Sequence, residues 1–141
     1  MDKLKRLVKL ARIVRQAFEK LEPYNSDLRG CCYHASVQLA YLAQKEGIPA
    51  EIGTAPEHVF VLLGNTIVDV TATQFGKRRK VVVGDLRTLI SQTCCGYVYM
   101  KPWFLQNRIS NLRSLQDYGW HKTSRRDRIA VLTALRSKEG R

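Results

Sequence analysis

The stretch His58-Val-Phe-Val-Leu-Leu-Gly-Asn-Thr-Ile-Val-Asp-Val-Thr71 decides the fold that the sequence predicts. Its two arms are rich in β-branched and apolar residues, and Gly64-Asn65 separates them. Such a dipeptide is typical of a two-residue turn between antiparallel strands. The stretch therefore predicts a β-hairpin whose arms are residues 58–63 and 66–71.

The length of the turn also predicts which side chains meet. A two-residue turn pairs Leu63 with Thr66, and counting back along both arms places Phe60 opposite Asp69. Because side chains alternate between the two faces of a strand, His58 lies on the same face as Phe60 and therefore as Asp69. This register predicts a contact between the His58 imidazole and the Asp69 carboxylate, which a slip of one residue would abolish.

A helix is predicted upstream of the hairpin, over residues 32–45. Ala35, Leu39 and Leu42 recur at helical spacing, and Gly47 ends the pattern. Cys32 stands at the start of this helix, where unpaired N–H groups and the helix dipole stabilise a thiolate. The same N–H groups can donate to the oxyanion of a tetrahedral intermediate.

Cys32, His58 and Asp69 are therefore the candidate catalytic residues, in this order along the chain. A thiol, an imidazole and a carboxylate suit acyl transfer, in which the His deprotonates the thiol and the Asp orients the His. Each residue alone has a simpler interpretation, since free Cys is among the most buried residue types. The hypothesis depends on the three together.

Two segments resemble known cysteine enzymes. The run Gly30-Cys31-Cys32-Tyr33-His34-Ala35-Ser36 is similar to the nucleophile helix of papain-like peptidases. The segments Glu57-His58-Val-Phe-Val and Ile67-Val-Asp69-Val-Thr71-Ala-Thr-Gln-Phe75 resemble the His and Asp strands of transglutaminase-like domains, particularly small bacterial and phage proteins with a Val-Asp-x-Thr-Ala-x-Gln-Phe signature. The resemblance covers residues 28–76.

This resemblance implies an α+β fold, in which a nucleophile helix packs on a small antiparallel sheet and further helices flank it. It implies a cysteine hydrolase or acyltransferase, either a peptidase or a protein-glutamine deamidase, working through a thioester. Cys32 would be the nucleophile, His58 the general base and then acid, and Asp69 the orienting carboxylate. Cys31 is the competing nucleophile, but the spacing to the aromatic and hydroxyl residues of the motif fits Cys32.

Other residues are weaker candidates for the same site. Tyr24, Asn25 and Ser26 stand where these families place an oxyanion donor, and Tyr33 and Gln74 are candidates to line the site. Gln74 could equally cap a loop.

The remaining segments are predicted to complete one domain spanning residues 1–141, with its core at about residues 22–101. Apolar periodicity predicts an amphipathic helix over residues 3–21, in which Arg15 belongs to the polar face. Further predicted elements are strands at residues 50–54, 80–84 and 96–100, and helices at residues 103–116 and 124–137 within a C-terminal helical segment, 102–137. Residues 137–141 are expected to be a frayed tail.

Composition narrows the class of protein. The 141 residues are 45% hydrophobic and 26% charged, and no apolar run approaches the length that spans a bilayer. The amino terminus lacks the continuous apolar core of a secretory signal. The cysteines form two adjacent pairs, Cys31-Cys32 and Cys94-Cys95, which suit neither a disulfide framework nor a zinc site. We therefore expect a cytoplasmic protein, of a bacterium or of the host of a phage or injected effector, with no metal and no cofactor.

The formal net charge of +12 favours an acidic protein or peptide substrate, nucleic acid or an anionic surface. No helix-turn-helix or RNA-recognition motif accompanies it. The alternative function is a catalytically silent basic interaction protein that binds a host protein or nucleic acid, and the sequence leaves the oligomeric state open. Two dense clusters of cations would then matter more than Cys32: Lys77, Arg78, Arg79 and Lys80, and Lys122, Arg125, Arg126 and Arg128.

Overall fold

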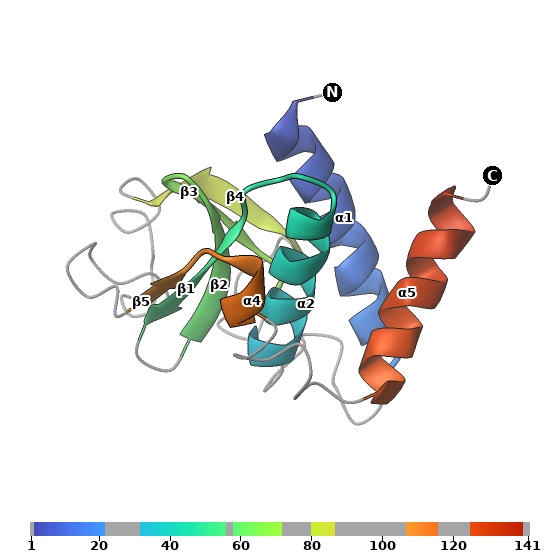
Figure 1. Ribbon diagram of the computed structural model, residues 1–141. Coiled ribbons are helices and arrows are strands. Elements are labelled where there is room, and N and C mark those ends of the chain that lie inside the picture. Colours follow the sequence, from blue (N-terminus) through green and yellow to red (C-terminus); the bar gives the residue numbers. More distant parts are fainter. Residues whose placement is uncertain are drawn as a thin grey trace.

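The computed structural model describes residues 2–21, 32–55, 58–71, 80–86, 107–115 and 125–139. These residues form a mixed helix and antiparallel-sheet fold of the α+β class (Figure 1). The helices are α1 (Lys3–Glu19), α2 (Cys32–Lys45), α4 (Leu112–Leu115) and α5 (Arg125–Glu139). The strands are β1 (Glu51–Ala55), β2 (His58–Leu63), β3 (Thr66–Asp69), β4 (Val82–Asp85) and β5 (Asn107–Ile109).

The predicted hairpin is present with the predicted register. Leu63 pairs with Thr66, and the ladder continues to Val61 and Val68. Gly64 has φ of 60°, a conformation of hairpin turns that a side chain disfavours and glycine adopts freely. The second arm is shorter than expected, because β3 ends at Asp69.

The sheet has the order β4-β3-β2-β1-β5, and every neighbouring pair is antiparallel. Two predictions for the C-terminal segment are wrong. Part of the predicted helix 103–116 is β5, which pairs with β1 through Ile109 and Ile52. The predicted frayed tail, residues 137–141, is wrong for residues 137–139, because α5 runs to Glu139. The edge of β1 supplies backbone partners to β5, and this tertiary pairing overrides the local helical pattern.

Both faces of the sheet are buried. Figure 1 shows α1 and α2 beside one face, with α5 outside α1. Val61 and Val68 belong to the core that these helices form with the sheet. Phe60 and Leu62 alternate with those positions and are also buried, and a Cβ built on Gly53 would lie 2.7 Å from Phe60 Cε2. The second face is therefore closely packed as well.

Helix α1 begins at an N-cap, since Asp2 Oδ1 accepts a hydrogen bond from the Lys5 backbone N–H at 2.9 Å. The prediction that Arg15 lies on its polar face is wrong, because Arg15 is only 2% exposed. Ala11 and Phe18 lie one turn before and after it and are fully buried, so helical geometry directs Arg15 toward the sheet. No helix in the described ranges has the length and apolar character needed to cross a membrane.

Candidate functional site

His58 and Asp69 make a buried contact at the end of the hairpin away from its turn. His58 Nε2 lies 2.6 Å from Asp69 Oδ2, and the two side chains are 1% and 0% exposed. The register-based prediction of this contact is confirmed. A distance this short is typical of hydrogen bonds strengthened by a charged group.

The second oxygen of Asp69 is also engaged. Asp69 Oδ1 accepts hydrogen bonds from the Thr71 backbone N–H at 2.9 Å and from Thr71 Oγ1 at 3.3 Å. This is an Asx turn, and Thr71 is fully buried. Both oxygens are thus fixed, which keeps the carboxylate aimed at His58. Thr71 was not predicted to belong to the site, although the spacing Asp-x-Thr is a sequence signal for this turn.

Two helix side chains bind the strand ends beside this His–Asp pair. Ser36 Oγ donates to the carbonyl of Val59 at 3.1 Å. Arg15 Nη1 donates to the carbonyl of Val70 at 2.8 Å. Val59 follows His58 in the chain and Val70 follows Asp69, so α2 and α1 each contact the residue next to one member of the pair.

Cys32 is the first residue of α2, as predicted. The described part of the structure includes its backbone but not its side chain. Ser36, one turn later, contacts Val59 near the start of β2. Gln44 near the other end of α2 donates to the carbonyl of Ala50 at 2.6 Å, beside the far end of the sheet. The amino terminus of α2 therefore lies toward the end of β2 that carries the His.

The His–Asp pair lies on the sheet face opposite to α2. The rings of His58 and Phe60 have centroids 5.7 Å apart, and Phe60 shares its face with Gly53, whereas Val61 faces the helices. Because His58 is the first residue of β2, contact with Cys32 requires the two to meet beyond the end of the strand.

The other predicted site residues divide into two groups. Tyr33 is partly buried against the core, and its ring lies edge-on to that of His34 at 5.2 Å between centroids. It contributes to the packing of α2. The remaining predictions concern residues outside the described ranges: Tyr24, Asn25, Ser26, Cys31, Gln74, Cys94 and Cys95.

The two basic clusters are described only in part. Lys80 Nζ lies 2.9 Å from Glu19 Oε2, and Arg126 Nη2 lies 3.1 Å from Oδ1 of the buried Asp127. Arg125 is exposed and Arg128 is half-buried. Lys77, Arg78, Arg79 and Lys122 lie outside the described ranges. Intramolecular pairing therefore lowers the net charge that Lys80 and Arg126 present to a partner.

Comparison of the chain with protein-family models, curated protein sequences and solved structures found no match in any of the three. Among the residues that the structure describes, no group of three or more His, Cys, Asp or Glu side chains is placed to hold a metal ion. The geometry of the site is therefore the basis for any functional argument.

Proposed function

We propose that this protein is a cysteine-dependent amide hydrolase or acyltransferase of the papain- and transglutaminase-like type, a peptidase or a protein-glutamine deamidase. The observation that carries the proposal is the buried contact of 2.6 Å between His58 and Asp69. The start of α2, where Cys32 stands, lies toward the same end of the sheet. The backbone of Cys32, the His58 imidazole and the Asp69 carboxylate thus lie toward one end of the sheet.

The chemistry follows from the way His58 is held. Asp69 engages Nε2, so Nδ1 is the ring nitrogen that takes the proton from the Cys32 thiol. The thiolate attacks the amide carbon, and backbone N–H groups in the first turn of α2 stabilise the oxyanion. His58 then protonates the departing amine or ammonia. Water hydrolyses the thioester, which releases the carboxylic acid and restores the thiol.

Burial strengthens this arrangement. The attraction between a carboxylate and an imidazolium is greater in a low-dielectric interior than in water. With both of its oxygens fixed, Asp69 stabilises the protonated His58 without having to reorient. A His–Asp pair that only stabilised the fold would satisfy the same two buried polar groups. The reactivity of Cys32 therefore distinguishes a catalytic pair from a structural one.

The proposal is tested by the rate at which iodoacetamide labels each cysteine, read by peptide mass spectrometry. Cys32 should react fastest, and His58→Gln should slow the labelling of Cys32 selectively. Cys32→Ala should abolish both the fast labelling and the release of ammonia or new amino termini from glutamine-containing peptides. Cys31→Ala is the matched control and should retain both.

Two outcomes would contradict the proposal. One is fast labelling or turnover that persists in Cys32→Ala. The other is a labelling rate of Cys32 that does not change in His58→Gln while the variant remains folded.

A further inference from the structure

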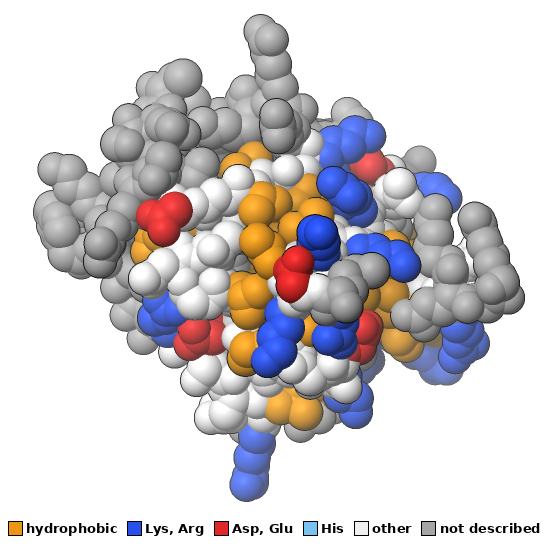
Figure 2. All heavy atoms as spheres, turned by 90° about the horizontal axis from the view of Figure 1, so that it is seen from above, with side chains coloured by type: hydrophobic (Ala, Val, Ile, Leu, Met, Phe, Trp, Pro, Cys, Tyr) orange, Lys and Arg blue, Asp and Glu red, His pale blue; other side chains and the backbone are white. Residues whose placement is uncertain are grey.

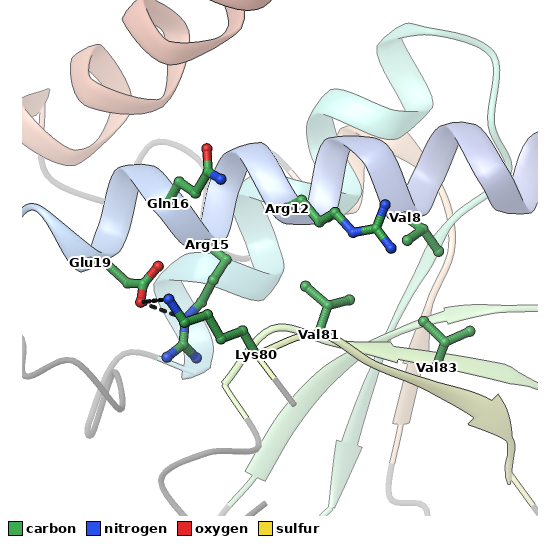
Figure 3. Close-up of a pocket in the computed structure, with 8 residues that line it drawn as sticks. All are labelled: Val8, Arg12, Arg15, Gln16, Glu19, Lys80, Val81 and Val83. Atoms are coloured by element: carbon green, nitrogen blue, oxygen red, sulfur yellow. Dashed lines mark ion pairs between the residues drawn. The ribbon is translucent and has the colours of Figure 1, made fainter. Parts of the chain in front are cut away.

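A groove runs between α1 and the edge strand β4 (Figure 3). It consists of two adjoining cavities of about 570 and 620 Å³, which share Val8, Arg12 and Val83 as lining residues. In Figure 3, the side chains of Val81, just before β4, and Val83, within β4, point toward α1, and Val8 lies on the side of α1 that faces them. The groove thus has one helical wall and one wall formed by the rim of the sheet.

The floor of the groove is apolar. It includes Leu4 and Val8 from α1, and Val81 and Val83 from the sheet rim. Val83 is 41% exposed, one of few large hydrophobic side chains so exposed in the described part of the chain. On the face drawn in Figure 2, hydrophobic side chains form a band with Lys and Arg side chains along one of its sides. Contact with an apolar side chain of a ligand removes water from such a surface, and this lowers the free energy of binding.

The rim of the groove is cationic. Lys5, Lys9 and Arg12 line it and are exposed, and within the described residues they form no ion pair. Among the described residues that line the groove, Glu19 alone is acidic, and it pairs with Lys80 at 2.9 Å and lies 3.8 Å from Arg15. A surplus of positive charge therefore faces the groove, and it complements a ligand with carboxylates.

The strand that borders the groove, β4, lies at the end of the sheet that the described residues form. β4 pairs with β3 and ends the sheet order, and no other described strand lies on its outer side. An edge strand presents backbone N–H and C=O groups at the spacing of a further extended chain. An apolar floor, a cationic rim and an open strand edge thus occur together.

We propose that this groove binds an extended segment of a partner protein in which every second residue faces the groove, and in which these facing residues are alternately apolar and acidic. The apolar side chains contact Val8 and Val83, while the carboxylates pair with Lys9 and Arg12. The backbone of the segment adds to the edge of β4. A sugar–phosphate backbone offers no side chains for the apolar floor, and a lipid surface does not enter a groove, so both fit these features less well.

This inference goes beyond the proposed chemistry and does not depend on it. The groove nevertheless lies near the candidate site, because Arg15 lines it and also donates to the carbonyl of Val70, beside Asp69. A segment bound here would hold its protein close to that end of the sheet.

The test is fluorescence anisotropy with a labelled peptide that repeats Val-Ser-Glu-Ser, so that Val and Glu share one face of the extended chain. The peptide is about ten residues long so that it exceeds the length of β4. We expect saturable binding that a peptide with Gln in place of Glu does not show. Arg12→Glu and Lys9→Glu should each weaken binding about tenfold, because each places like charges together. Val83→Ser should also weaken binding, since it removes apolar area from the floor.

Arg136→Glu is the matched control, since Arg136 is an exposed cation of α5 that does not line the groove. It makes the same change in net charge and should leave binding within about twofold, because distant exposed charges are screened. Circular dichroism and thermal unfolding check that every variant is folded. His58→Gln should bind the peptide normally, so failure of docking and failure of catalysis are scored separately.

Several results would overturn the proposal. Absence of saturable binding, or equal weakening by Arg12→Glu and Arg136→Glu, would show general charge attraction instead of a groove. Binding to phosphatidylserine-containing vesicles or to a single-stranded oligonucleotide that needs Arg12, while peptide binding does not, would assign the groove to a lipid or a nucleic acid.

Discussion

The two ends of the β2–β3 hairpin receive the same kind of contact in different surroundings. At the turn, Arg108 Nη2 donates to the carbonyl of Gly64 at 2.6 Å, at the exposed surface. At the other end, Arg15 Nη1 donates to the carbonyl of Val70 at 2.8 Å, in the interior. Arg108 is exposed, whereas Arg15 is 2% exposed.

This difference in burial determines how much each hydrogen bond contributes to the stability of the fold. Water competes for an exposed guanidinium and carbonyl, so losing that contact leaves both groups solvated. A buried carbonyl that loses its donor stays without a replacement and keeps the full cost of desolvation. The turn end is therefore fixed by the local backbone, while the end that carries His58 and Asp69 depends on buried contacts with the helices.

The largest effect is expected from Asp69→Ala. This change removes the partner of the buried His58 and the acceptor for the Thr71 N–H together. Breaking a buried charged pair from one side typically costs about 3–5 kcal/mol, and we expect the free energy of unfolding in urea to fall by that amount.

Asn65→Ala, at the exposed turn of the same hairpin, is the comparison for Asp69→Ala. It should change stability by less than about 0.5 kcal/mol, as surface substitutions usually do. If both variants unfold at the same urea concentration as the wild type, the buried end of the hairpin does not depend on the His–Asp contact.

The next effect compares the two arginines directly. Arg15→Met keeps an unbranched apolar stem but removes the donor to Val70, so the free energy of unfolding should fall by about 1.5–3 kcal/mol, the range for hydrogen bonds from charged groups. Arg108→Met removes the donor to Gly64 and an ion pair with Glu51 at 2.7 Å. Because these contacts are exposed, Arg108→Met should lower the free energy of unfolding by less than about 1 kcal/mol.

Cysteine labelling gives Arg15→Met a second readout. If Arg15 sets the position of Asp69 through Val70, the variant should also label Cys32 more slowly than the wild type does, whereas Arg108→Met should not. Equal losses of stability in the two variants would show that burial does not distinguish these contacts.

The same contrast explains which parts of the molecule were predictable from sequence. The hairpin register follows from Gly64 and the alternation of its arms, and α2 follows from helical periodicity, so both were predicted locally. The buried position of Arg15 and the strand that contains Ile109 were not, because distant elements impose them. The role of Thr71 was predictable only in part. Its Asp-x-Thr spacing is a local signal for the turn, but its role at the site depends on the contact between Asp69 and His58, which are distant in sequence.

Gly64→Ala, at the turn, should have a smaller effect than Asp69→Ala or Arg15→Met. Gly64 has φ of 60°, and a Cβ at this position would meet nothing within 4 Å. The cost is therefore that of the left-handed backbone alone, about 1–2 kcal/mol. Gly64→Asn should cost less, because Asn tolerates this conformation. Since Gly64 is distant from the His–Asp pair, urea unfolding should detect the loss in Gly64→Ala while the labelling rate of Cys32 stays at the wild-type value. A slower rate would mean that strain at the turn reaches the buried end, and that the two ends are not independent.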